Sequence, residues 1–403
     1  METSVNPFIP DHVPLELVRE PRFQTLAGGA TCPFAAARAL QDEGPLFWNP
    51  EHRNFGGAWM VTRAADIRYV TSHPELFSNK GEAGFSKLLG EDWDLVPLEI
   101  DPPMHGEFRR AFNHLIAPPA VERVSDDVRR RAIGLIEGFK PNGGCEFMDS
   151  FGFPFPVGVF LSVMGFPESE MPTFLAWGHG LLNGATIAER VDAARAIKDY
   201  LVTLAAERRA RPIGDIVSQV VHARISSRAL TDEEVLGALY LIFIAGIDTV
   251  ASTLSFAFKH LAENPDHRRQ LIANPKKIPR AIEEYMRRFS TVTSARQAVE
   301  DVELHGQRIK AGDWISVTYA MGSLDPAEFA DPMTVDYDRA ANRHFGFAYG
   351  PHFCMGSHLA RREMNIAFEE WLTRIPDFEL ATPDTGRARP GAVFGTGPLE
   401  LVW

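Results

Sequence analysis

The chain has 403 residues, of which 45% are hydrophobic and 23% charged, and it carries a formal net charge of −12. This composition supplies a large core, and the acidic balance argues against nucleic acid as the main partner, because phosphate binding needs a basic field. Its three cysteines, Cys32, Cys145 and Cys354, are odd in number and show no CxxC spacing. Neither a disulfide framework nor a structural zinc site is therefore expected, and a reducing cytoplasm fits.

The chain is expected to fold as one compact unit over residues 1–403. It contains no Ser/Gly-rich linker, low-complexity tract or internal repeat. The first residues show no basic signal region, and the most apolar stretch, LGALYLIFIAGI, stops at Asp248, short of a membrane-spanning length. We therefore expect a soluble, cytoplasmic monomer that binds neither a membrane nor nucleic acid.

Helical spacing of apolar residues, interrupted by prolines, predicts helices over residues 103–116, 121–138, 157–165, 189–208, 232–262, 277–289 and 357–373. Strand-like stretches are fewer and shorter, at residues 57–62, 298–309 and 399–403. The expected fold class is therefore mainly α, a helix-rich unit with small β-sheets.

The predicted helix 232–262 carries an acid and an alcohol inside an apolar segment. Residues 236–258 are hydrophobic nearly all round, yet AGIDT at 245–249 contains Gly246, Asp248 and Thr249. Glycine lowers helix stability and a threonine hydroxyl competes for a backbone carbonyl one turn back, so this sequence can open a local bulge, and bulges favour functional sites. In a functional role the hydroxyl would hold a bound oxygen species and the carboxylate would relay protons toward it. In a structural role the glycine would serve packing and the aspartate would face solvent.

Residues 281–290, AIEEYMRRFS, place Glu284 and Arg287 three positions apart on one helix face, where they can pair. Most such pairs are solvated surface contacts that contribute little to stability. This pair becomes informative only together with the other motifs.

The stretch HFGFAYGPHFCMGSHLARREM, residues 344–364, places Cys354 between Gly350 and Gly356. The two glycines allow positive φ and a close backbone approach. Because a predicted helix follows directly, Cys354 lies just before a helix N-terminus, where the dipole and the unpaired amides stabilise a thiolate. A buried structural thiol, the common role of a free cysteine, needs none of these features.

Three features, in their chain order and at their separations, resemble the cytochrome P-450 family of heme-thiolate monooxygenases. They are AGIDT at 245–249, Glu284 with Arg287, and Cys354 in FAYGPHFCMG. The resemblance covers essentially the whole chain. It is strongest to soluble bacterial members of the camphor-hydroxylase branch, through DPPMHGEFRR, EEYMRRFS, GSHLARRE and EWLTRIPDFEL. It implies a cytochrome P-450 fold, one heme b, and hydroxylation of an unactivated C–H bond in a small apolar, terpenoid-like compound. Norisoprenoids of the ionone type are the preferred candidates.

The resemblance also implies roles for individual residues. Cys354 would be the axial thiolate ligand of the iron, and Asp248 and Thr249 would be the catalytic proton relay. A charge network behind the heme loop would comprise Glu284, Arg287 and Arg339. The positions that match heme-binding residues are His105, Arg109, Arg296, Phe347, His352 and Gly356, among which the histidines and arginines would hold the propionates through charge-assisted hydrogen bonds.

Two departures from the family pattern stand out. Ala348 follows the loop aromatic where the family usually has glycine, so a positive φ there would be mildly strained. Camphor-hydroxylating relatives present a tyrosine hydroxyl and a threonine where this chain has Trp93 and Leu98, which puts camphor itself in doubt as the substrate. The expected substrate-binding residues are Trp93, Leu98, Leu241, Ile244, Val292 and Val393, with Phe85 as a further candidate.

The chain shows no GxGxxG after a strand, so electrons must come from another protein. The resemblance implies a [2Fe-2S] ferredoxin with its own reductase. Its expected docking face is a local basic patch of Arg109, Arg110, His352, Arg361 and Arg362.

Two other functions could use the same cysteine. A heme-thiolate redox or gas sensor has no need of Asp248 and Thr249. A cysteine-nucleophile hydrolase needs a histidine base, for which His352 or His358 is available, but it leaves the acid and the alcohol in the apolar helix unexplained.

Overall fold

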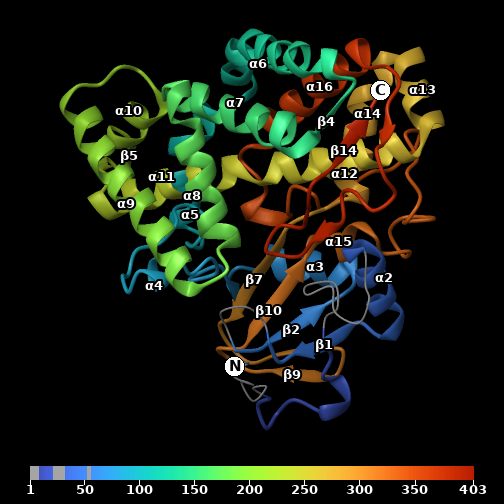
Figure 1. Ribbon diagram of the computed structural model, residues 1–403. Helices are drawn as coiled ribbons and strands as arrows, with labels where there is room; N and C mark the ends of the chain where they lie inside the picture. The colour runs from blue at the N-terminus through green and yellow to red at the C-terminus, as the bar shows by residue number, and fades with distance from the viewer. Residues whose placement is uncertain (1–8, 21–31, 52–55) are drawn as a thin grey trace.

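The computed structural model describes residues 9–20, 32–51 and 56–403. The expected mainly α class is confirmed, because helices form most of the molecule and the sheets are small. Figure 1 shows the largest sheet at the bottom beside α2 and α3, with helices above it and to its left. The helices are α2 Pro33–Glu43, α3 Ala64–Ser72, α4 Phe85–Leu88, α5 Met104–Phe112, α6 Pro118–Phe139, α7 Pro154–Met164, α8 Met171–Asn183, α9 Ile187–Ala210, α10 Ile216–Val221, α11 Asp232–Ile247, α12 Thr249–Glu263, α13 Pro265–Ala273, α14 Ile278–Arg288, α15 Tyr319–Ser323 and α16 Ser357–Arg374.

The largest sheet has five strands in the order β1-β2-β10-β7-β3. These strands are β1 Leu46–Asn49, β2 Ala58–Val61, β3 Phe77–Ser78, β7 Thr293–Ala298 and β10 Trp314–Thr318. Strand β2 pairs antiparallel with β1 and parallel with β10, so Trp59 lies opposite both Trp48 and Ile315. All four residues of β2 are buried, which explains why its sequence is a continuous apolar run rather than an alternating one.

Short strands form the remaining sheets. A three-stranded sheet joins β11 Glu379–Leu380, β14 Glu400–Val402 and β4 Gly144–Glu146. Two-stranded hairpins pair β5 Arg224–Ile225 with β6 Arg228–Ala229, β8 Val302–Leu304 with β9 Gln307–Ile309, and β12 Ala388–Arg389 with β13 Gly395–Thr396.

Helices α11 and α12 follow one another through the middle of the molecule, where α12 crosses the view of Figure 1. A capping box starts α11, since the Thr231 hydroxyl accepts from the Glu234 amide and the Glu234 carboxylate accepts from the Thr231 amide. The run Asp232–Glu263 is long and apolar enough to cross a membrane, but 61% of its most apolar window is buried inside the protein. Its apolar side chains therefore serve the core.

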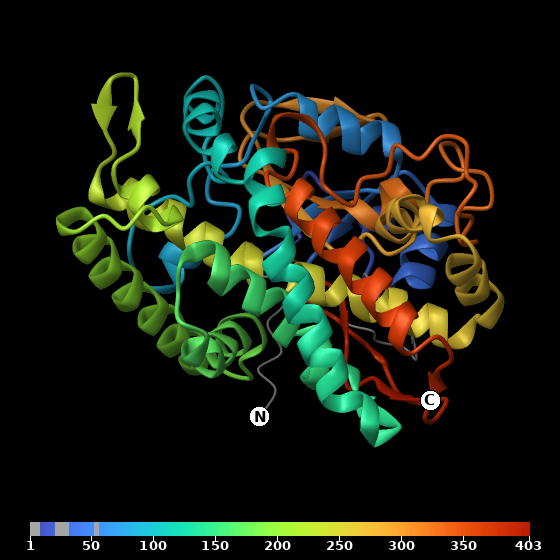
Figure 2. The ribbon, with the colours of Figure 1, turned by 90° about the horizontal axis from the view of Figure 1, so that it is seen from above.

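Two hydrophobic clusters fill the interior. One gathers the large sheet with α12, α14 and α16 around Trp59 and Trp371. The other gathers α7, α8, α9 and α11 around Trp93 and Tyr240. Figure 2 shows α6 lying along α16, and these two helices are in direct contact. The start of α16, and with it the cysteine loop, is thereby fixed to the rest of the fold.

Several predicted elements need correction. The single helix predicted at 232–262 is two helices that meet at Asp248. The strand predicted at 298–309 is mostly the β8–β9 hairpin, because His305 and Gly306 take positive φ values of 51° and 73° and turn the chain. Helices α2, α3, α8 and α13 were not predicted, since their short apolar patterns are fixed by packing against neighbours rather than by their own sequence.

Candidate active site

The cysteine loop, residues 344–356, is a tight turn that directly precedes α16. The Cys354 amide donates to the Phe347 carbonyl at 2.9 Å, and the Ala348 amide donates to the Phe345 carbonyl at 2.8 Å. Ala348 takes φ 61°, the strained value expected for an alanine in this place. Gly350 takes φ 76°, and an added Cβ there would collide with the Thr71 carbonyl oxygen. Glycine is therefore required at position 350 by both conformation and space.

Gly356 does not take the positive φ that the sequence analysis allowed for it. Its φ is −75°, so it does not need the freedom of glycine, and it is the N-cap of α16. Its amide and that of Ser357 hydrogen-bond to the Cys354 sulfur and lower the thiol pKa. They act as predicted for a helix N-terminus.

The Cys354 thiol is exposed by surface area, yet the protein crowds it closely enough to limit its hydration. That desolvation is the largest influence on it and raises the thiol pKa, while the charges of Arg109 and Arg361 act in the opposite direction. Among the described residues no hydrogen bond joins this thiol to His352 or His358, so the structure offers no cysteine–histidine pair for a hydrolase.

A buried ion-pair network supports the loop from behind. Arg287 donates from Nε and Nη2 to the two carboxylate oxygens of Glu284, at 2.8 Å each. Arg339 and Asn342 add hydrogen bonds to the same carboxylate at 3.2 Å and 3.1 Å. Both partners of the central pair are fully enclosed, with side-chain exposures of 0% and 1%. The surface alternative for this pair is thereby excluded.

Four basic side chains predicted to bind heme come together beside the loop. The rings of His105 and His352 lie 4.2 Å apart, and His352 also feels the charges of Arg296 and Arg109. Burial is the main reason that the pKa values fall to about 4 for His105 and about 2 for His352. The two imidazoles are therefore neutral at pH 7.

These side chains fit the carboxylates of a heme. Among the described residues, Nε2 of His105 and Nε2 of His352 are buried without a hydrogen-bond partner, an arrangement that native proteins seldom leave unsatisfied. Arg296 is 2% exposed, with its nearest carboxylate, Glu82, 3.5 Å away. Phe347 is buried in the same loop with the guanidinium carbon of Arg361 4.3 Å from its ring centroid.

Asp248 and Thr249 lie at the junction of α11 and α12 but have different surroundings. Asp248 is 5% exposed, so it does not face solvent, and burial raises the pKa of its carboxyl. The Thr249 hydroxyl donates to the Ala245 carbonyl at 3.0 Å, as expected for a hydroxyl that competes for a backbone acceptor. Gly246 has a packing role, because an added Cβ would lie 2.5 Å from the Phe160 ring.

Five of the six predicted substrate residues fall into two groups. Leu98, Leu241 and Ile244 are half-buried against the cluster around Tyr240, and Phe85 joins them. Val292 and Val393 face one another across an isolated antiparallel bridge. Leu241, Ala245 and Thr249 recur every four residues and keep some exposure, so they share one accessible face of the helix pair.

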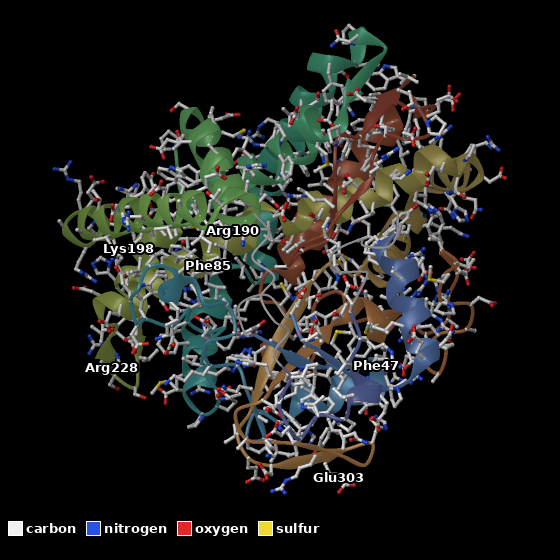
Figure 3. The ribbon with its side chains drawn as sticks, turned by 60° about the horizontal axis from the view of Figure 1, so that its bottom comes forward. Phe47, Phe85, Arg190, Lys198, Arg228 and Glu303 are labelled. Atoms are coloured by element: carbon white, nitrogen blue, oxygen red, sulfur yellow. The ribbon has the colours of Figure 1, made fainter. Side chains whose placement is uncertain are left out.

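Trp93 differs from the other five because its polar atom is already bonded. Its Nε1–H donates to the Glu91 carboxylate at 2.7 Å, and Lys198 of α9 pairs with the same carboxylate. Figure 3 shows Lys198 on α9 next to Phe85 of α4, and these helices are in contact. The indole is thus tied to Glu91 and α9 and is not a free donor toward a substrate.

The predicted basic docking face is only partly available. His352 is buried, Arg361 pairs with Glu283 at 2.6 Å, and Arg362 pairs with Glu122 at 3.3 Å. Arg109 donates to the Phe353 carbonyl at 2.7 Å. Arg110 is exposed, and no ion pair involves it within the part of the chain that the structure describes.

Sequence analysis missed three residues that the structure brings to the site. Glu91 and Lys198 fix Trp93, and Arg389 of β12 pairs with Asp248. Glu91 is two positions from Trp93 and could have been suspected. Nothing in the sequence connects Arg389 to an aspartate 141 positions away.

Comparisons with known proteins agree on one family. A cytochrome P450 family model matches residues 174–390. The chain is 40% identical to "Probable cytochrome P450 127A1" of Sinorhizobium fredii over 99% of this chain and 98% of that protein. It is 28% identical to "Cytochrome P450-terp" of a Pseudomonas species, over 87% of this chain and 89% of that protein. The crystal structure of cytochrome P450 CYP101C1 aligns with a TM-score of 0.88 at 30% identity, covering 98% of this chain and 100% of the other.

Proposed function

Because this chain belongs to the cytochrome P450 family of heme-thiolate monooxygenases, we propose that it hydroxylates an unactivated C–H bond of a small apolar, terpenoid-like compound in the cytoplasm. The reaction uses O2 and two electrons from a ferredoxin. Heme with a cysteine thiolate ligand is the cofactor of the family and of this chain. When bound, the heme supplies the activation of oxygen and the oxidising power.

Cys354 is the residue suited to be that ligand. Among the cysteines, Cys145 has its thiol pKa raised to about 12 by burial and neighbouring carboxylates, which makes it a poor thiolate. Burial also raises the thiol pKa of Cys354, but there two helix N-terminal amides and the charges of two arginines oppose the rise and favour the thiolate. His105, Arg109, Arg296 and His352 would hold the heme carboxylates through N–H donors, and Phe347 would cover the loop side.

Asp248 and Thr249 are suited to move protons. Burial raises the pKa of the Asp248 carboxyl, which makes its protonated, proton-donating form more accessible than in a solvated aspartate. The Thr249 hydroxyl, one residue on, can accept a hydrogen bond at Oγ1 while it donates to the Ala245 carbonyl. A sensor needs no such pair, so this arrangement favours the monooxygenase over that alternative.

The apolar nature of the substrate rests on one observation. Five of the six proposed pocket residues are aliphatic, and the sixth, Trp93, has its N–H committed to Glu91 at 2.7 Å. A substrate carbonyl or hydroxyl would find no donor among these side chains, so binding must come from apolar contact. The similarity to a protein named cytochrome P450-terp supports the terpenoid class.

A ligand titration tests the substrate proposal. The change in heme spin state is measured with camphor, with α- and β-ionone, and with a fatty acid of similar carbon number. We expect the ionones to bind more tightly than camphor and to give the fuller high-spin shift. Tightest binding of camphor would reverse this ranking, and tightest binding of the fatty acid would contradict the terpenoid class.

The electron donor is the second part of the proposal. Arg110 borders an open surface hollow of about 380 Å³ that is also lined by Arg224 of β5 and by Glu107, and its two exposed arginines suit a small acidic ferredoxin. First-electron transfer from a reconstituted ferredoxin is measured across a salt series for the parent, for Arg110→Glu and for Arg308→Glu, a control on the distant β8–β9 hairpin. We expect salt and Arg110→Glu to slow the reaction and Arg308→Glu to leave it unchanged. Equal rates in all three proteins would contradict docking at Arg110.

A further inference from the structure

Asp248 has a charged partner from a distant part of the chain. The Arg389 Nη2 lies 3.4 Å from the Asp248 Oδ1, and their side chains are 26% and 7% exposed. Arg389 belongs to β12 of the C-terminal hairpin, whereas Asp248 joins α11 to α12. The carboxylate is the enclosed partner, so losing the guanidinium would leave Asp248 with little access to water in its place.

The surroundings are shaped to admit this guanidinium. On the opposite strand of the hairpin, a Cβ added to Gly395 would lie 3.0 Å from the Arg389 Nη2 and 3.1 Å from the Ser252 Oγ. Ser252 is one turn after Asp248 and its hydroxyl lies 3.5 Å from the same carboxylate oxygen. Glycine at position 395 therefore leaves the space in which Arg389 reaches between the hairpin and α12.

The same hairpin carries one of the proposed substrate residues. Val393 lies in the turn between β12 and β13 and bridges to Val292. The turn is hydrogen-bonded on both sides of this bridge, from the Thr293 amide to the Ala392 carbonyl at 3.0 Å and from the Phe394 amide to the Thr291 carbonyl at 2.9 Å. Arg389 and Val393 are only four residues apart, so the turn that a ligand at Val393 would contact is continuous with the strand that holds Arg389.

We propose that Arg389 is a positioning residue, which orients the Asp248 carboxylate and couples its charge state to the occupancy of the substrate pocket through the β12–β13 hairpin. The inference rests on the proposed role of Asp248 in moving protons. It gives the hairpin a function beyond lining the pocket, because a correctly seated substrate would set the proton-donating group as well as its own position.

The direction of the effect follows from the charges around Asp248. Three elements present polar or charged groups to it: Arg389 from β12, Ser252 from α12 and His179 from α8. Burial is the largest influence and raises the Asp248 pKa, while the Arg389 charge lowers it. Removing Arg389 therefore raises this pKa further, because the nearby positive charge that favours the carboxylate is lost.

The charge state can be measured without turnover. In the heme-loaded protein, the infrared C=O band of the protonated Asp248 carboxyl is isolated by subtracting the spectrum of Asp248→Asn and is followed against pH. We expect Arg389→Gln to move the midpoint upward by about one unit. We expect Arg389→Lys, which keeps the positive charge, to have a midpoint close to that of the parent. We expect a bound substrate to move the midpoint in the parent and not in Arg389→Gln. An unchanged midpoint in Arg389→Gln would overturn the proposal.

Two further variants separate this role from a general effect on the hairpin. Arg387→Gln removes an exposed cation of the same hairpin that pairs with Asp384, and we expect no shift of the midpoint. Gly395→Ala keeps the Arg389 charge but places a Cβ 3.0 Å from its Nη2, so the guanidinium must shift, and we expect a smaller upward shift of the midpoint than in Arg389→Gln. A midpoint shift in Arg387→Gln equal to that in Arg389→Gln, or none in Gly395→Ala, would contradict the geometry.

The rate of product formation distinguishes this inference from the proposed function. If Asp248→Asn turns over as fast as the parent, the proton role of Asp248 fails. If Asp248→Asn is slow but Arg389→Gln behaves as the parent, only the role of Arg389 fails. Because Arg389 acts through Asp248, we expect the double variant to be no slower than Asp248→Asn alone, whereas multiplied losses would mean that Arg389 acts elsewhere.

Discussion

Replacement of Glu284 by glutamine should be among the most destabilising single changes behind the heme loop. Arg287 is completely enclosed and its Nε and Nη2 both donate to Glu284, at 2.8 Å each. A glutamine keeps one oxygen but turns an NH2 group toward the guanidinium, so the buried positive charge loses its compensation. Breaking one partner of such a pair costs about 3–5 kcal/mol.

The effect should reach the heme loop. Arg287 also donates to the Ser323 carbonyl at 3.0 Å, and the Ser323 hydroxyl accepts from the Phe345 amide at 2.9 Å, where the cysteine loop begins. Urea unfolding followed by circular dichroism measures stability, and the Soret band measures heme retention. We expect Glu284→Gln to lose heme at a lower urea concentration than the parent.

A surface carboxylate provides the control. Asp42 pairs with Arg38 one helical turn away but is 68% exposed, so Asp42→Asn should cost less than about 0.5 kcal/mol. If Glu284→Gln costs no more than Asp42→Asn, the claim that the buried pair holds the heme loop is wrong.

Three further outcomes follow from the site. Cys354→His should remove the red-shifted CO band of a thiolate-ligated heme while circular dichroism remains that of a folded protein; survival of the band would exclude Cys354 as the ligand. Thr249→Ala should keep substrate binding but divert NADH-derived electrons to peroxide, whereas Asp248→Asn should slow turnover by about 100-fold; unchanged coupling in the first and unchanged turnover in the second would remove the relay. Trp93→Phe should change substrate affinity by less than about threefold, because its N–H already serves Glu91 at 2.7 Å; a tenfold loss would show that the indole contacts the substrate through that N–H.

The sequence determined the fold class and the family because these depend on local patterns. Helical periodicity located α6, α9, α14 and α16 to within a few residues. The motif around Cys354, the Glu284–Arg287 spacing and AGIDT at 245–249 are each contiguous, so they could be read without knowing the fold. Even the strain at Ala348 was visible as the absence of an expected glycine, and the structure gives it φ 61°.

Burial and long-range contacts were decided by the tertiary structure. The spacing of Glu284 and Arg287 in the sequence does not tell whether the pair is buried or on the surface. The packing of the folded chain encloses it fully. His352 was expected on a basic surface but is buried and neutral, with a pKa of about 2. The predicted helix 232–262 divides at Asp248, where the Thr249 hydroxyl takes up the Ala245 carbonyl, an interaction that periodicity does not report.

The chemistry of the individual groups depends most on contacts that no local pattern encodes. Trp93 could have offered its N–H to a substrate, but the Glu91 carboxylate, which also pairs with Lys198, accepts it. Asp248 could have been a solvated carboxylate, but the fold buries it and brings Arg389 from the C-terminal hairpin to its side. Sequence specifies which groups are present, whereas their pKa values and partners follow from desolvation and from charges that only the folded chain brings within a few ångströms.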